Sequence, residues 1–78
     1  MKFTAYFNHT RERSDRREIQ LDWIERAIVH PDADRVQADG RIRRWKKIPE
    51  AKDRWLRVVL LEDGETVHNA FFDRRFRG

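Results

Sequence analysis

The first residues of the chain alternate between apolar and polar side chains. Within residues 1–7, apolar side chains occupy every second position after Met1, at Phe3, Ala5 and Phe7. Successive side chains of a strand point to opposite faces, so this period of two predicts a short strand over residues 1–7. Residues 8–18 have no apolar side chain beyond methyl groups. A helix there would be polar all round and exposed, with Asn8 or Thr10 available to cap it.

Residues 21–30 have the apolar spacing of an amphipathic helix. Leu21, Ile24, Ala27 and Ile28 would share one face of that helix. Pro31 ends it, because proline lacks an amide donor and disfavours helix in the residue before it.

The remainder of the chain predicts an antiparallel sheet. Strand-like runs at residues 35–38 and 41–48 flank Asp39-Gly40, and runs at 55–61 and 66–73 flank Asp63-Gly64. Asp-Gly between such runs predicts tight hairpins in which both turn residues have positive φ. Residues 49–53 read as a polar loop. We therefore expect a single α+β domain over residues 1–78. It would have a short N-terminal strand, one or two helices and a mainly antiparallel meander sheet, with the 21–30 helix packed on one face.

Composition restricts the partners of this fold. The 78 residues are 41% charged, and the excess of Lys and Arg over Asp and Glu gives a net charge of +4. Aromatic residues make up 12% of the chain, enough large side chains to favour a folded core over disorder. Cysteine is absent, which excludes disulfides and thiolate metal sites. The apolar runs are too short to span a bilayer. We expect a cytoplasmic protein that uses no cofactor or metal and binds an anionic partner.

His9, Arg13 and Arg17 recur every four residues, and Ile19 follows. On a helix the three polar side chains would lie along one face and could hold a phosphate beside a titratable imidazole. Ile19 would anchor the end of this stretch to the core. The alternative is a solvated, charged turn. The histidines show no metal-ligand spacing.

Basic residues surround an aromatic side chain in the predicted 41–48 strand. The cations are Arg41, Arg43, Arg44, Lys46 and Lys47, and the aromatic residue is Trp45. Cations that neutralise phosphates beside an indole that stacks on a base suit RNA binding. The alternative places Trp45 in the core and leaves the cations on the wet face of an edge strand. Arg74, Arg75 and Arg77 form a second basic cluster.

His68 lies in the predicted last strand. Strand alternation would put it on the same face as Thr66, Ala70 and Phe72, opposite Val67, Asn69 and Phe71. The alternatives for His68 are a structural histidine of the sheet and a catalytic partner of His9.

The order of these features resembles a known family. The run His9-x3-Arg13-x3-Arg17-x-Ile19 is followed by a helix that ends before Pro31, a basic strand after Asp-Gly, and a late Val67-His68-Asn69-Ala70-Phe71. This order resembles a family of small bacterial domains of unknown function in the RelE/ParE toxin superfamily, within the barnase/colicin/RelE-like nuclease fold. The resemblance implies a sheet packed on N-terminal helices, a concave basic face and a cognate antitoxin-like protein as partner. It matches His9, Arg13 and Arg17 to the family's leading residues and places Asn69 where the family often has threonine.

Two functions follow as hypotheses. In the first, the protein is a toxin-like protein that binds RNA or the ribosome, or a metal-independent ribonuclease. His9 would act as general acid or base with His68 as counterpart, and Arg13 and Arg17 would stabilise the charged phosphorane. The basic residues of the 41–48 strand, together with Trp45, Arg74 and Arg75, would bind and position the RNA. In the second, the protein is a non-catalytic binding module that docks on a partner protein by strand addition.

Overall fold

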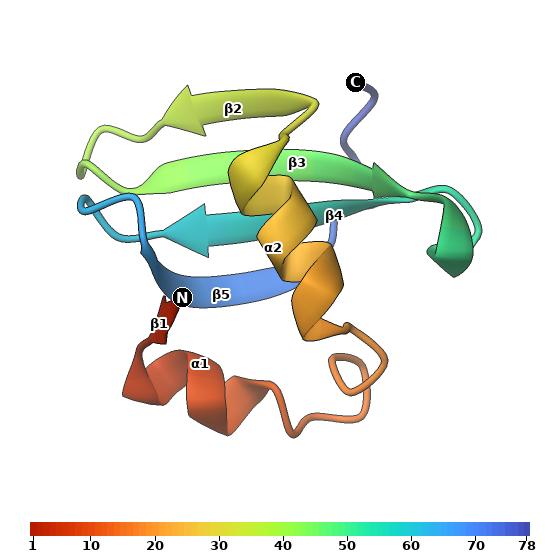
Figure 1. Cartoon of the computed structure of the whole chain (residues 1–78), viewed down its shortest axis with the longest axis horizontal. Helices are drawn as coiled ribbons and strands as arrows, with labels where there is room; N and C mark the ends of the chain where they lie inside the picture. The colour runs from red at the N-terminus through yellow and green to blue at the C-terminus, as the bar shows by residue number, and fades with distance from the viewer.

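The computed structural model describes residues 1–78. Its elements, in chain order, are β1 (Lys2–Phe3), α1 (Ala5–Thr10), α2 (Leu21–Val29), β2 (Ala33–Val36), β3 (Ile42–Ile48), the 3₁₀ turn η1 (Pro49–Ala51), β4 (Arg54–Leu60) and β5 (Thr66–Phe72). The predicted α+β fold, with its short first strand, helices and meander, is confirmed (Figure 1). Neither helix is long and apolar enough to cross a bilayer.

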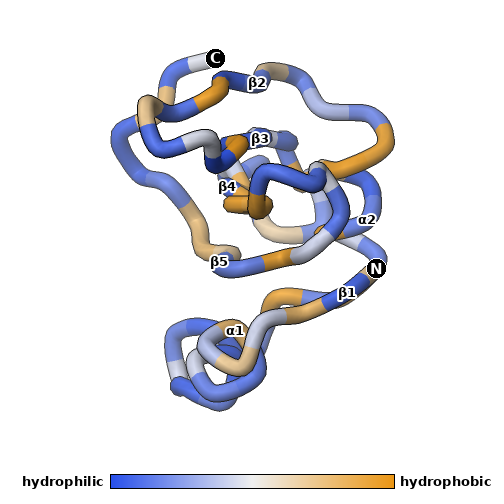
Figure 2. The backbone as a smooth tube through the Cα atoms, turned by 90° about the vertical axis from the view of Figure 1, so that its left-hand side faces the viewer, coloured by the Kyte–Doolittle hydropathy of each residue, from blue (hydrophilic) through white to orange (hydrophobic).

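The strands form one sheet in the order β1-β5-β4-β3-β2. β2 to β5 are antiparallel neighbours, whereas β1 runs parallel to β5, with Lys2 beside Thr66 and Phe3 beside Val67. α2 crosses one face of this sheet. α1 lies beside β5, at the same edge of the sheet as β1 (Figures 1 and 2). β1 pairs with only Thr66 and Val67 of β5, so the rest of the β5 edge has no strand beside it.

The core lies between α2 and the sheet. Ile24 and Ala27 of α2 are buried, as the helical spacing predicts. The largest fully buried side chains of the core are Ile24, Ile48, Leu56, Val58, Leu60 and Val67. The predicted helix over 21–30 is confirmed to within one residue, and the backbone leaves it at His30, immediately before Pro31. Ile19 packs against this core, as expected for an anchor.

The N-terminal segment differs from the prediction. Only Lys2–Phe3 is strand, and the chain enters α1 at Ala5. The Thr4 hydroxyl accepts a hydrogen bond from the Phe7 amide at 3.0 Å and caps the helix. Phe3 and Phe7, read as alternating strand positions, instead stack across the start of α1 with ring centroids 5.1 Å apart. Residues four apart also share a face on a helix, so the short alternation could not distinguish the two structures.

The polar stretch that follows is mostly not helical. α1 ends at Thr10, which is buried, and residues 11–18 form successive turns. The expectation that Asn8 or Thr10 caps a helix over residues 8–18 is therefore wrong, since both residues lie inside α1. A helix without an apolar face gains little from packing, so turns are the expected outcome.

The predicted hairpins are confirmed, but their turns are wider than the two-residue turns that Asp-Gly predicts. Gly40 and Gly64 have positive φ (91° and 70°), whereas Asp39 and Asp63 do not. Each aspartate instead accepts backbone amide hydrogen bonds, at 3.0 Å from Arg41 and at 2.9 Å from Glu65. The side chains thus close longer loops in which only glycine needs the left-handed conformation.

Candidate nucleic-acid interface

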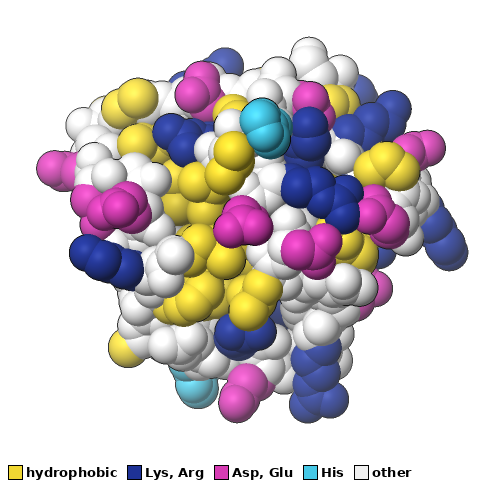
Figure 3. All heavy atoms as spheres, viewed as in Figure 1, with side chains coloured by type: hydrophobic (Ala, Val, Ile, Leu, Met, Phe, Trp, Pro, Cys, Tyr) yellow, Lys and Arg dark blue, Asp and Glu magenta, His cyan; other side chains and the backbone are white.

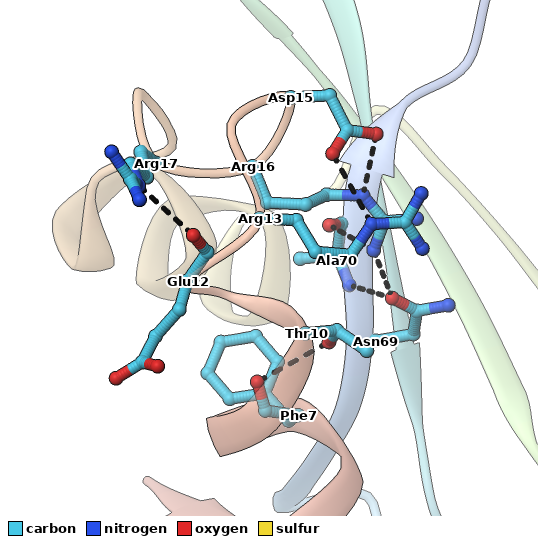
Figure 4. Close-up of polar contacts among 9 residues, drawn as sticks. All are labelled: Phe7, Thr10, Glu12, Arg13, Asp15, Arg16, Arg17, Asn69 and Ala70. Carbon is cyan, nitrogen blue, oxygen red and sulfur yellow. Dashed lines mark hydrogen bonds and ion pairs between the residues drawn. The ribbon is translucent and has the colours of Figure 1, made fainter.

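His9, Arg13 and Arg17 do not line up, because the helix needed to align them ends at Thr10. Arg13 reaches Asp15 at 3.4 Å, whereas the Arg17 Nε donates to the Glu12 carbonyl at 2.9 Å. Figure 4 shows Arg13 directed toward β5 and Arg17 directed away from it. His9 is exposed in the last turn of α1. The predicted helical phosphate clamp is therefore wrong, and the catalytic role of these residues and His68 stays a prediction.

Arg16, which no spacing in the sequence singles out, makes the main contact between the 11–18 turns and the sheet. Its guanidinium donates to the Asn69 Oδ1 at 2.6 Å and to the Ala70 carbonyl at 3.4 Å (Figure 4). It also lies over the Phe71 ring at 5.2 Å. Only 14% of its side chain is exposed. Arg16 thus joins the 11–18 turns to the part of the β5 edge that β1 leaves unpaired. No spacing distinguished it from the neighbouring arginines.

His68 lies at a β-bulge. Val59 pairs with Asn69, but Leu60 pairs with Val67, so His68 has no direct partner on β4. The extra residue overturns the predicted alternation, since Val67 faces the same core as Ala70 and Phe72. The His68 Nδ1 lies 3.1 Å from the Thr4 hydroxyl, and the ring stacks on Tyr6 at 4.8 Å. Burial, and then the Arg41 charge, lower the pKa of His68 below its usual value and favour the neutral imidazole.

Strand alternation divides the basic residues of β3 between two faces. Arg44 and Lys46 lie on the side of α2, where Arg44 donates to the Ile28 carbonyl at 2.8 Å. Lys46 pairs with Asp32 at 3.3 Å. Figure 3 shows that this side of the molecule carries interleaved basic and acidic side chains.

The opposite side of the sheet has no helix over it, and we call it the open face. The pairing registers place on it Arg35, Arg43, Trp45, Lys47, Trp55, Arg57, Val59, Asn69 and Phe71. Arg35 lies directly opposite Arg43, which puts two like charges side by side across β2 and β3. Neither guanidinium has a carboxylate within 4.0 Å, and the Lys47 ammonium forms no ion pair, although the Lys47 amide donates to the Asp32 Oδ2 at 3.0 Å. The Arg43 Nε is buried without a hydrogen-bond partner.

Aromatic rings alternate with these cations. Arg57, the cross-strand partner of Trp45, lies over the rings of Trp45 and Phe71 at 5.8 and 5.1 Å. Lys47 lies 6.0 Å from the Trp55 ring centroid. The open face is thus a surface of cations and π-faces, the combination that binds backbone phosphates and unstacked bases.

Trp45 itself is covered. It is buried, and its ring stacks on Phe76 with centroids 4.5 Å apart and planes 12° apart. Its Nε1 donates to the Asp73 Oδ2 at 3.1 Å. Burial raises the pKa of Asp73. The hydrogen bonds from Trp45 and Arg75 and the charge of Arg57 together lower this pKa by more than burial raises it, so the pKa of Asp73 lies below its usual value. Trp45 is thus buried, as the alternative expected, but it lies under Phe76 and outside the core between α2 and the sheet. The other part of that alternative is wrong, because β3 is an inner strand and not an edge strand.

The remaining predicted contacts lie at the ends of the sheet. Arg41 is in the β2–β3 turn, 3.9 Å from Asp39. Arg74 and Arg75 are exposed beyond β5, on the segment that leads to Phe76. This segment and α2 lie on opposite sides of the sheet (Figure 2). Of the predicted RNA-binding residues, Arg43 and Lys47 lie on the open face, and Arg44 and Lys46 do not. Nowhere do three or more histidine or carboxylate side chains gather as metal ligands would.

Comparisons with family models, with curated proteins and with solved structures find no match for the chain. The resemblance to the RelE/ParE superfamily therefore stays a sequence-based expectation. The class that the fold and the interface define is a small α+β domain with one basic, aromatic sheet face left uncovered by helices.

Proposed function

We propose that this protein binds RNA through the open face and that this binding underlies a toxin-like role in the bacterial cytoplasm. The observation that carries the proposal is the placement of Arg35 directly opposite Arg43, with no carboxylate near either. Like charges facing each other across strands destabilise a sheet. A phosphate bound between them would remove that repulsion and supply an acceptor to both guanidinium groups.

The contrast between the two sides of β3 supports the same proposal. Toward α2, Arg44 lies 4.0 Å from Asp34, and Lys46 is paired with Asp32. On the open face, Arg43 alternates with them along the same strand and has no acidic partner, and Lys47 contacts Asp32 only through its backbone amide. Charges left uncompensated by the protein are those that attract an external polyanion.

The test is a pair of matched double variants within the β2–β3 region. Arg35→Gln with Arg43→Gln removes two cations from the open face, and Arg44→Gln with Lys46→Gln removes two from the α2 side. Binding of a single-stranded RNA is measured at several salt concentrations. We expect the open-face variant to lower the slope of log K against log salt by about 1.4, since each contact to a single strand contributes roughly 0.7.

The control variant should keep most of the slope. Equal slopes for the two double variants, with both proteins folded by circular dichroism, would refute the open face as the RNA site. Growth arrest on expression of the wild type, relieved by the open-face variant, would support the toxin-like role. No step of this proposal requires His9, Arg13 or Arg17 to act on RNA.

The free edge of β2 favours a second candidate function, docking on a partner protein. Gln37 donates to the Arg41 carbonyl at 2.7 Å, and alternation along the ladder then directs the backbone groups of Asp34 and Val36 outward. Val36 is 69% exposed. A strand of an antitoxin-like partner could add at this edge. Stoichiometric co-purification with a neighbouring gene product, lost in Val36→Pro, would support this function; co-purification unchanged in that variant would refute the edge as the site.

A further inference from the structure

We infer that the Phe76 ring occupies a stacking site for one unpaired nucleobase, and that RNA binding replaces Phe76 on Trp45. This inference rests on the proposed function and adds that the RNA bound by the open face is single-stranded. Phe76 lies parallel to the Trp45 ring at 4.5 Å, while Trp55 meets its edge at 5.0 Å with planes 69° apart. A flat ring between one face and one edge is the arrangement in which proteins hold an extruded base.

The site is built independently of Phe76. Trp45 is fixed by the hydrogen bond from its Nε1 to Asp73. Asp73 is held in turn by Arg57 at 3.4 Å and by its own amide, which donates to the Trp55 carbonyl at 2.8 Å. The indole therefore keeps its orientation whether Phe76 or another ring covers it. A rigid platform of this kind suits exchange of one aromatic ring for another.

Phe76 is held less firmly than its platform. The last hydrogen bond of the segment before it runs from the Arg75 amide to Asp73, and residues 74 and 75 are exposed. Phe76 itself is half-buried, and beyond it Gly78 approaches the Trp55 ring. The Phe76 ring and this small contact are what keep residues 76–78 on the sheet. The segment can thus leave without breaking any ladder hydrogen bond of β5.

The surroundings fit a nucleotide. A groove of about 710 Å³ lies between residues 14–18 and residues 71–77. Trp55, Phe71 and Phe76 form part of its wall. Its charged lining is mixed: Arg16, Arg54, Arg74 and Arg77 border it together with Asp15, Glu18 and Asp73, and Arg16 and Arg54 are paired with Asp15 and Glu18. Apolar rings would receive the base, and Arg74 and Arg77, which form no ion pair, would receive the flanking phosphates. Arg74 and Arg77 lie before and after Phe76 in the sequence. After Phe76 has left Trp45, these two arginines could therefore still contact the phosphates of the bound RNA.

The test compares wild type with Phe76→Ala and Phe76→Trp. Removing the competing ring should tighten binding of a six-nucleotide single-stranded RNA by roughly three- to tenfold, because the open site no longer has to be populated first. The larger Trp ring should weaken that binding. Inorganic polyphosphate, which has the charge but no bases, should bind all three proteins alike. A blunt RNA duplex, whose bases remain paired, should also not distinguish them.

NMR of the wild type keeps the inference testable if a variant fails to fold. The Phe76 ring protons and the Trp45 Nε1 proton should shift on titration with the single-stranded RNA and stay in place with polyphosphate. RNA binding that leaves the Phe76 signals unmoved, or a folded Phe76→Ala protein with unchanged affinity, would overturn this inference alone. A wild type that binds no RNA would overturn the proposed function and this inference together.

Discussion

Replacement of Arg16 by alanine should destabilise the protein more than replacement of either arginine singled out by spacing. The Arg16 guanidinium bonds the Asn69 side chain at 2.6 Å and lies 5.2 Å from the Phe71 ring centroid. A hydrogen bond to a charged group contributes about 1.5–3 kcal/mol, and an exposed cation–π contact about 0.5–1 kcal/mol. The Asn69 Oδ1 still accepts from the Ala70 amide at 3.0 Å in the variant, so it is not left unpaired. We therefore expect a loss of about 2 kcal/mol.

Urea denaturation followed by tryptophan fluorescence measures this loss as a lower midpoint at constant slope. For a domain of this size, about 2 kcal/mol corresponds to a fall in Tm of roughly 8–16 °C. Arg17→Ala is the matched control, since its exposed bond to the Glu12 carbonyl should be worth less than about 0.5 kcal/mol. Equal midpoints for the two variants would refute the conclusion that Arg16 secures the β5 edge.

Further predictions concern pH, turns, core and interface. Burial lowers the pKa of His68, so the unfolded chain binds its proton more readily; the free energy of unfolding should fall as pH drops below about 6.5, and less so in His68→Gln. Gly40→Ala should lower Tm more than Gly64→Ala: both have positive φ, but the new Cβ would lie 2.7 Å from the Glu62 side chain at Gly40 and no closer than 3.9 Å to Ile42 at Gly64. Ile24→Ala should cost about 2–5 kcal/mol in chemical denaturation, because Ile24 is 1% exposed. Arg35→Gln alone should raise Tm while weakening RNA binding, because it removes cross-strand repulsion; a lowered Tm would count against that repulsion.

The long periodic segments were predictable from the sequence. The helix that begins at Leu21 has apolar residues at the helical period, and Pro31 marks its end. The Asp-Gly pairs located the two hairpins and the apolar run of β4 marked a central strand, but β2 lies at Ala33–Val36, two residues before the predicted 35–38 strand. The seven-residue N-terminal alternation was too short, because Phe3 and Phe7 satisfy both the strand and the helix period. The local signal for the helix is Thr4, whose hydroxyl caps it, because threonine is a preferred N-cap residue.

The site was predictable only in part. Alternation along β3 could have separated Arg43 from Arg44 once the face toward the helix was known. The bulge at His68 inserts one residue into β5, so the side chains after it point to the opposite face from the one that alternation predicts. No residue type in the sequence indicates this bulge. The docking of Arg16 on Asn69 joins positions 53 residues apart, which no local pattern specifies. The stacking of Phe76 on Trp45 likewise depends on tertiary packing and not on a local pattern.

The central claim is that RNA contacts the face of the sheet opposite α2. The arginine Nε–Hε resonances test it directly, because they report side chains and so separate the two faces of one strand. On titration with a single-stranded RNA, we predict large shifts for Arg35 and Arg43 and small shifts for Arg44 and for Arg26 of α2. Shifts concentrated on Arg26 and Arg44, with Arg35 and Arg43 unchanged, would contradict the account.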